Sequence, residues 1–269
     1  METFTDQLNR TVSIPSSPRR IISLVPSQTE LLYDLGLRDE VIGITKFCVH
    51  PEEWFRSKKR VGGTKTYDFE KIAELAPDLI IGNKEENEQE QIEALMADYN
   101  VWMSDIYTLE DALEMIVKLG ELLGRTTAAV ELKTKIERAF AELDAFVVNT
   151  RIKNKKVAYF IWRQPYMVAA NHTFIHHMLK RCGFTNVFPE DTFTRYPEIS
   201  PLQLRAAAPD VILLSSEPYP FKEKHVGEFQ QICSQAKIIT VDGELFSWYG
   251  SRLLYAPAYF MNLIRTVFS

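Results

Sequence analysis

The sequence predicts an α/β protein with two lobes, each built on a central, mainly parallel sheet flanked by helices. Two observations support this: one order of elements occurs twice, and a long helical segment separates the two occurrences. The stretches ELAPDLIIG (74–82) and AAAPDVILL (206–214) each read as the end of a helix and the start of a strand, because proline disfavours helical geometry in the preceding residue. Their continuous apolar runs are typical of strands buried on both faces.

In the first half, predicted strands and helices alternate. Apolar β-rich runs indicate the strands, and apolar spacing of three to four residues indicates the helices, the first of which is closed by Gly36. The predicted elements are strand 19–25, helix 27–36, strand 40–45, helix 68–76 and strand 78–82.

The second half repeats this order. Basic residues again lead into a strand, and Gly183 closes a helix as Gly36 does. The predicted elements are strand 155–162, helix 172–183, strand 185–188, and a helix followed by a buried strand within 200–215. The matched order indicates an internal duplication. Alternating strands and helices imply right-handed βαβ units and a parallel sheet in each half.

The segment between the halves, 108–151, is predicted to be helical. Thr108 and Asp111 resemble a capping box, and an amphipathic pattern predicts one helix from Thr126 to about Thr150. Such a helix spans roughly 37 Å and would form a rigid connection between the lobes. We therefore predict three regions: an amino-terminal lobe 1–107, connecting helices 108–151 and a carboxyl-terminal lobe 152–269.

Composition narrows the function classes. Hydrophobic residues make up 46% and charged residues 25% of the chain, which is typical of a soluble globular protein. The net charge of −5 argues against a nucleic-acid partner. The amino terminus lacks the apolar core of a signal peptide, and no apolar run reaches 18 residues. We expect a cytoplasmic location unless a leader has been removed.

Ligands of open parallel sheets bind beyond the carboxyl ends of the strands. In the first lobe, the loops expected there are 26–30, 46–51 and 83–87, and in the second lobe they are 162–167, 215–221 and 242–252. The second set is rich in aromatic residues, with two arginines beside them: Trp162, Tyr166, Tyr219, Phe246, Trp248, Tyr249, Arg163 and Arg252. This mixture suits a large, partly planar anionic ligand. Packing of these aromatic rings against the core is the alternative interpretation.

The residues do not predict a metal site held by the protein. Cys48 and His50 are close in sequence, but the adjacent His176 and His177 point to different faces of a helix. The three cysteines show no CxxC spacing, and Cys48 reads as a small buried residue.

Catalytic motifs are absent too. Ser27 lacks a GxSxG elbow and reads as a helix cap, while the acidic run 84–90 reads as a solvated helix face. Neither GxGxxG nor GxxxxGK[ST] occurs in the chain. We therefore expect a protein that is not an enzyme.

Six stretches together resemble the substrate-binding proteins of ABC importers for vitamin B12 and ferric siderophores. They are RRIISLVPSQTELLYDLGLRDEVIGIT, VGGTKTYDFEKIAELAPDLIIG, KKVAYFIWRQPY, CGFTNVF, PLQLRAAAPDVILL and DGELFSWYGSR. The resemblance covers nearly the whole chain. It implies two α/β lobes joined by one long helix, a ligand held in the cleft between them, and docking on a membrane permease.

The resemblance also implies roles for individual residues. In the family a glutamate on each lobe engages the permease, and Glu70 stands at the first-lobe position. Ser247 stands where the second glutamate is expected, with Glu244 near but not aligned. Thr64 stands where the vitamin B12 binders have a tryptophan, so a planar contact is missing there.

We therefore predict a binding protein for a metal chelate, with cobalamin or a related corrinoid ahead of a ferric siderophore or haem. It would act as a monomer without a cofactor of its own, and the family implies the periplasm or cell surface. The alternative is a cytosolic enzyme or cofactor-handling protein on the same bilobal fold. The predicted ligand-binding residues are Pro26, Ser27, Gln28, Phe47, His50, Tyr67, Trp162, Arg163, Tyr166, Glu217, Phe246, Trp248, Tyr249 and Arg252.

Overall fold

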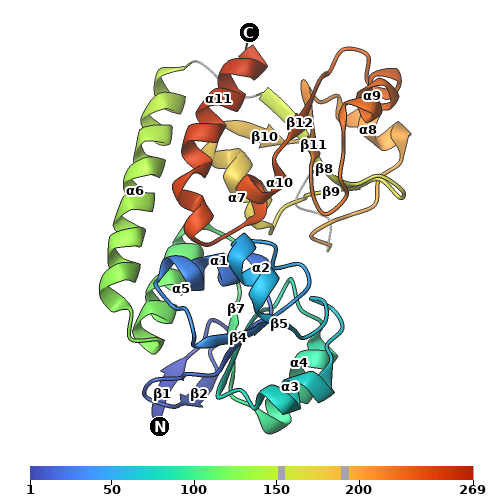
Figure 1. The fold of residues 1–269 in the computed structure, drawn as a ribbon. Helices are drawn as coiled ribbons and strands as arrows, with labels where there is room; N and C mark the ends of the chain where they lie inside the picture. Colours follow the sequence, from blue (N-terminus) through green and yellow to red (C-terminus); the bar gives the residue numbers. More distant parts are fainter. Residues whose placement is uncertain (151–154, 189–193, 269) are drawn as a thin grey trace. The chain divides into compact units, whose positions relative to one another are not determined.

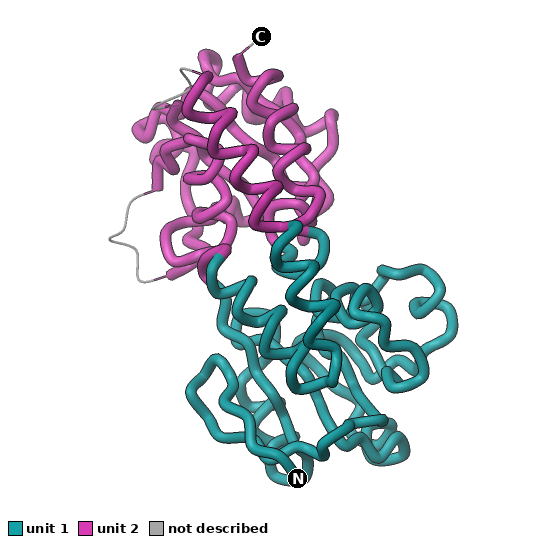
Figure 2. Tube along the Cα trace, turned by 90° about the vertical axis from the view of Figure 1, so that its left-hand side faces the viewer, with its two compact units in different colours: residues 1–106, 110–135, 248–252 teal, residues 107–109, 136–247, 253–269 magenta. Residues whose placement is uncertain are grey.

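The computed structural model describes residues 1–150, 155–188 and 194–268. The chain forms two compact units, coloured separately in Figure 2. Unit 1 comprises residues 1–106, 110–135 and 248–252, and unit 2 comprises residues 107–109, 136–247 and 253–269. The predicted boundary at 151/152 lies outside the described residues, so the three-region division stays a prediction.

Unit 1 is built on a five-stranded sheet in which all strand pairs are parallel (Figure 1). Its strand order is β5-β4-β3-β6-β7. The strands are β3 (Ile21–Ser23), β4 (Val41–Ile44), β5 (Lys59–Arg60), β6 (Leu79–Asn83) and β7 (Val101–Ser104). The residues of β3, β6 and β7 are all buried, as the apolar runs of the predicted strands β3 and β6 indicate; β7 was not predicted.

The helices of unit 1 follow the strands in alternation. They are α1 (Pro26–Asp34), α2 (Glu52–Ser57), α3 (Phe69–Leu75), α4 (Gln89–Asp98) and α5 (Leu109–Leu122), whose first residue is grouped with unit 2. Helix α3 begins where the Asp68 side chain accepts a hydrogen bond from the Lys71 backbone, and it ends at Ala76, which has left-handed geometry before Pro77.

An amino-terminal hairpin of β1 (Glu2–Thr5) and β2 (Thr11–Ile14) was not expected from the sequence. The fully buried Asp6 accepts hydrogen bonds from the backbone of Leu8 and Arg10. The Gln7 backbone donates to Met103 of β7 at 3.1 Å, so the hairpin lies beside the outer strand of the sheet.

Unit 2 repeats the parallel sheet with the order β10-β8-β11-β12, and a short strand β9 pairs antiparallel with β8. The strands are β8 (Lys155–Trp162), β9 (Met167–Val168), β10 (Phe184–Asn186), β11 (Val211–Ser215) and β12 (Lys237–Val241). The predicted alternation of strands and helices in both halves is confirmed.

The helices of unit 2 include a close repeat of α3. The described helices are α7 (Phe174–Arg181), α8 (Pro201–Ala207), η1 (Glu223–His225), α9 (Val226–Ile232), α10 (Gly243–Ser247), η2 (Ser251–Leu254) and α11 (Ala256–Phe268). Ser200 caps α8 through a capping box with Gln203, and Ala208 ends it with left-handed geometry, as Ala76 ends α3. The segment 242–252 was expected to be a loop but contains α10 and the start of η2.

The predicted long helix is present as α6 (Thr126–Asn149). Its 24 residues span about 36 Å. Ile136, Phe140 and Leu143 are buried at helical spacing, which is the apolar face that the sequence pattern predicts. Residues up to 135 are grouped with unit 1 and the rest with unit 2.

Candidate functional site

A buried polar network lies at the carboxyl ends of β6 and β7 in unit 1. The Gln28 amide donates to Ser104 Oγ at 2.6 Å, and the Asn83 amide donates to the same oxygen at 2.9 Å. Asn87 Oδ1 accepts from the Asn83 backbone at 2.8 Å. Asn83 Oδ1 in turn accepts from the backbone of the next loop, at Glu85.

This network changes the interpretation of three predicted features. Gln28 is fully buried, so it contributes to the network that holds the loop after β6 and is not exposed to a ligand. Ser27 is buried in the first turn of α1 and does not cap it, since Val25 is the cap residue and no side chain fills that role. The acidic run 84–90 forms a turn, and α4 begins only at Gln89. Asn83 lies in the expected loop 83–87, whereas Ser104 was missed, although a polar residue closing a buried apolar strand is a visible signal.

The loop after β4 presents an exposed aromatic ring. Phe47 is 50% exposed, and the Lys46 ammonium lies 5.0 Å from its ring centroid. Tyr67 is buried instead, and its hydroxyl donates to Thr64 O at 2.9 Å. Burial raises the pKa of Tyr67, with nearby Glu88 acting in the same direction. Of these two predicted rings, Phe47 is the one available for a ligand.

Three predicted residues come together on unit 1. The guanidinium of Arg252 lies 4.6 Å from the ring centroid of Trp248, and the ring centroids of Trp248 and His50 are 5.6 Å apart. Arg252 also donates to both carboxylate oxygens of Glu30, at 2.9 and 2.6 Å. Glu30 lies in the expected loop 26–30, but its pairing was not predicted, because a glutamate inside an amphipathic helix reads as solvent-exposed.

At the carboxyl edge of the unit 2 sheet, Trp162 is 38% exposed, and its ring centroid lies 5.7 Å from that of Tyr219 in an edge-to-face arrangement. Beside it, the Arg163 guanidinium forms an ion pair with Glu228 at 2.8 Å. The Tyr166 hydroxyl donates to the same carboxylate. Burial, together with this hydrogen bond to Glu228, raises the pKa of Tyr166 to about 12.

Other aromatic residues predicted to bind ligand occupy packed positions. Phe246 is fully buried, with ring centroids 5.0 Å from Tyr159 and 4.6 Å from Phe260. This position supports packing rather than ligand contact. Tyr249 is also buried, and Tyr166 packs against the core ring of Phe229 at 5.3 Å.

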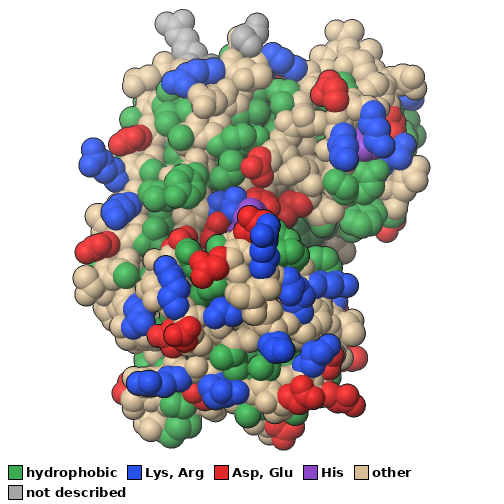
Figure 3. All heavy atoms as spheres, viewed as in Figure 1, with side chains coloured by type: hydrophobic (Ala, Val, Ile, Leu, Met, Phe, Trp, Pro, Cys, Tyr) green, Lys and Arg blue, Asp and Glu red, His purple; other side chains and the backbone are tan. Residues whose placement is uncertain are grey.

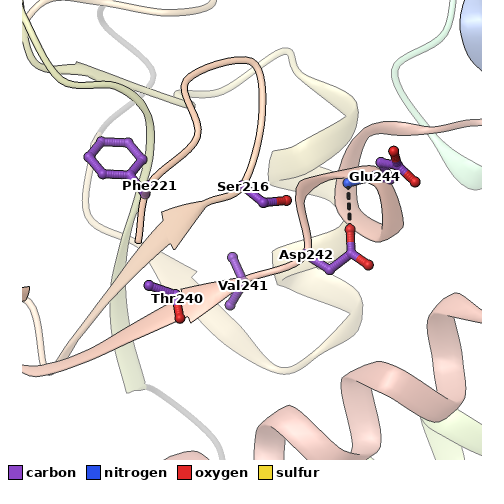
Figure 4. Close-up of a pocket in the computed structure, with 6 residues that line it drawn as sticks. All are labelled: Ser216, Phe221, Thr240, Val241, Asp242 and Glu244. Atoms are coloured by element: carbon purple, nitrogen blue, oxygen red, sulfur yellow. Dashed lines mark hydrogen bonds between the residues drawn. The ribbon is translucent and has the colours of Figure 1, made fainter. Parts of the chain in front are cut away.

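A pocket of about 490 Å³ lies where β11 and β12 end (Figure 4). It is lined by Ser216, Phe221, Thr240, Val241, Asp242 and Glu244. Asp242 Oδ1 accepts from the Glu244 backbone at 3.0 Å. Two carboxyl groups and two hydroxyls beside one aromatic ring suit a ligand group that donates hydrogen bonds. Ser216, Phe221, Asp242 and Glu244 lie in the loops expected at this edge, although none of the six was predicted individually to bind the ligand.

Glu217 directly follows Ser216, which lines this pocket. Its Oε1 accepts a hydrogen bond from Ser247 Oγ, at the end of α10, at 2.7 Å. Glu217, a predicted ligand-binding residue, therefore holds the side chain of Ser247. Ser247 stands at the position where the resemblance implies a docking glutamate.

The internal repeat gives another counterpart for Glu70. Glu70 is the second residue of α3 and is exposed, and the second residue of α8 is Leu202, which is 74% exposed. The two helices share their cap geometry, so Leu202 is the structural equivalent of Glu70.

Charge and metal-ligand arrangement add further observations. On the face in Figure 3, Lys and Arg side chains are interspersed with Asp and Glu. Among the described residues, no group of three or more His, Cys, Asp or Glu side chains could hold a metal ion. Cys48 is buried, and burial raises its pKa, so its thiol is an unreactive core group.

None of the helices in the described part of the chain is both long and apolar enough to cross a membrane.

Known proteins resemble this chain in sequence and fold. Residues 21–231 match the family described as periplasmic binding protein. A vitamin B12-binding protein of Photorhabdus laumondii is 27% identical over 245 residues, which is 91% of this chain and 87% of that protein. The periplasmic vitamin B12-binding protein BtuF of Vibrio cholerae has a TM-score of 0.82 at 21% identity, covering 95% of this chain and 100% of that structure. The periplasmic heme-binding protein RhuT from Roseiflexus sp. RS-1 has a TM-score of 0.80 at 20% identity, covering 94% and 100%. These similarities confirm the predicted fold class.

Proposed function

Because the chain belongs to the periplasmic binding protein family, we propose that it captures a metal chelate and delivers it to the permease of an ABC importer. The family match confirms the resemblance that the sequence motifs indicated, and it places the chain among binding proteins and not among enzymes. The enzyme alternative is therefore set aside.

Two exposed aromatic rings support the choice of a large, partly planar ligand. They lie at the carboxyl edges of the two parallel sheets. Phe47 follows β4 of unit 1 and Trp162 is the last residue of β8 in unit 2, and their side chains are 50% and 38% exposed. Ligands bind at this edge of such sheets, and stiff aromatic rings gain contact area at a low entropic cost. We propose that Phe47, His50, Trp162, Arg163 and Glu217 contact the ligand directly.

The acceptor groups of unit 2 favour a corrinoid within this class. The pocket contains Asp242 and Glu244, and the charge of Arg163, elsewhere in unit 2, is paired with Glu228. Carboxylates attract ligand groups that donate hydrogen bonds, such as amides, and repel ligand carboxylates. Cobalamin carries peripheral amides, whereas haem carries two carboxylates, so cobalamin or a related corrinoid is the first candidate and haem or a ferric siderophore the next.

The metal arrives inside its chelate in this proposal, and the protein supplies no ligand of its own to it. The cognate permease would contact unit 1 at Glu70, which is exposed near the start of α3. Transport of this kind implies a place outside the cytoplasmic membrane, which cell fractionation with an antibody to the chain would test.

The deciding experiment is a titration of the purified protein with aquocobalamin, cobinamide, haemin and a ferric hydroxamate, followed by calorimetry and absorbance. We expect binding of a corrinoid at micromolar concentration or below, and weaker binding of haemin. Absence of binding to all four would refute the proposal.

A pair of matched variants locates the site. Trp162→Ala should weaken binding about tenfold, because a stacked ring and its buried area contribute on the order of 1–2 kcal/mol. Phe268→Ala is the control, since that ring is 43% exposed but lies against Lys155, at the opposite edge of the same sheet. Equal effects of the two substitutions would place the ligand elsewhere.

A further inference from the structure

The segment Trp248–Arg252 has an unusual place in the chain. It is grouped with unit 1, whereas the residues on both sides, 136–247 and 253–269, are grouped with unit 2 (Figure 2). The chain therefore enters and leaves unit 1 within five residues. A segment this short needs strong contacts with the rest of unit 1 to stay in place.

The first of these contacts is a two-pronged ion pair. Arg252 donates through Nε and Nη2 to the two carboxylate oxygens of Glu30 on α1, at 2.9 and 2.6 Å. Both side chains are mostly withdrawn from water, at 17% and 19% exposed. A planar guanidinium matched to a carboxylate in this way fixes direction as well as distance.

A second contact extends from the same guanidinium. It lies 4.6 Å from the ring centroid of Trp248, which in turn meets the His50 ring edge-to-face at 5.6 Å. Glu30 therefore orients Arg252, and Arg252 lies against the indole that contacts His50. A carboxylate on α1 is thus linked through Arg252 to the buried ring of Trp248, and through that ring to His50.

The third contact is a close approach of two backbones. A Cβ atom added to Gly250 would lie 2.6 Å from the backbone oxygen of Ser27 and 3.4 Å from Leu31 Cβ. Only glycine lets the segment lie this close to the first turns of α1. The neighbouring Ser251 is buried, and its Oγ has no hydrogen-bond partner among the described residues.

We propose that Trp248–Arg252 is a strap fastened to α1, and that Glu30 is the positioning residue that holds it closed. Removal of the Glu30 carboxylate takes one counter-charge away from a mostly desolvated guanidinium, which is the costly way to break such a pair. The strap then opens more often, and the arrangement of Trp248 against His50 is lost while the sheet of unit 1 stays folded.

A single thiol reports the opening of the strap. Ser251→Cys, made together with Cys233→Ser, places a cysteine where no hydrogen bond is lost, because Ser251 Oγ has no partner. The remaining native thiols, Cys48 and Cys182, are buried. The rate of reaction with an aromatic disulfide reagent then measures how often residue 251 becomes accessible in the ligand-free protein.

We expect Glu30→Gln to raise this labelling rate about tenfold, and Gly250→Ala to raise it similarly. Arg252→Lys should give an intermediate rate, since it keeps the charge and loses the two-pronged geometry. Glu40→Gln is the matched control: it breaks the ion pair of Glu40 with Arg125, another partly exposed pair of unit 1, and should leave the rate unchanged. Unchanged labelling in both Glu30→Gln and Gly250→Ala, or an equal rise in the control, would overturn the proposal.

The effect on ligand affinity rests on the proposed function and is measured separately. If aquocobalamin binds the wild type, Glu30→Gln should weaken its binding several-fold more than Glu40→Gln does. If no chelate binds the wild type, the proposed function fails, while the labelling rates still decide whether the strap exists. Equal affinities in the two variants, with a raised labelling rate in Glu30→Gln, would leave the strap standing and remove Glu30 from ligand positioning.

Discussion

Replacing Phe246 separates a core role from a ligand-binding role. The ring is fully buried and packs against Tyr159 and Phe260, with centroid distances of 5.0 and 4.6 Å. Truncation of such a ring leaves a cavity and costs about 3–5 kcal/mol of unfolding free energy. At roughly 2–4 °C per kcal/mol for a chain of this size class, Phe246→Ala should lower Tm by roughly 6–20 °C.

Trp162→Ala gives the opposite pattern, because that ring is 38% exposed. We expect it to cost less than about 2 kcal/mol of unfolding free energy and to weaken chelate binding, whereas Phe246→Ala should bind normally wherever it is folded. Urea unfolding followed by circular dichroism gives the stabilities, and calorimetry at 10 °C gives the affinities. A stable Phe246→Ala protein that has lost its affinity would refute this division of roles.

Two further predictions concern single positions. Ala208→Gly should stabilise the protein to urea by about 0.5 kcal/mol, because the left-handed conformation at this helix end strains alanine; a loss of stability would contradict this. Gly82→Ala should cost about 1–3 kcal/mol in the same assay, because the new Cβ would lie 2.7 Å from Asn87 Oδ1 and displace a buried acceptor; a neutral result would mean that the network can adjust.

Local signals in the sequence predict much of the fold. The alternation of apolar runs with turn residues places the central strands, and the amphipathic period predicts α6 to within one residue at each end. The repeated Ala-Pro-Asp marks the end of α3 and of α8, because each alanine is the last residue before a proline. These features depend on neighbours along the chain.

Other features depend on contacts between distant residues. The hairpin β1–β2 is held beside β7 by Gln7 and Asp6, which contact residues nearly 100 positions away. Trp162 and Phe246 both read as aromatic residues near a strand end, yet one is exposed and the other buried, because α11 brings Phe260 onto Phe246. Glu30 reads as a surface residue for the same reason, since its partner is 222 positions away.

The Gln28 amide also provides an intrinsic spectroscopic reporter. Its side-chain nitrogen is buried at the carboxyl ends of two strands and donates to Ser104. Amide protons in such a place exchange slowly with solvent and resonate apart from those of surface glutamines. In nitrogen-edited NMR, this pair of signals would monitor the loop after β6 with no dye, no added thiol and no change of sequence.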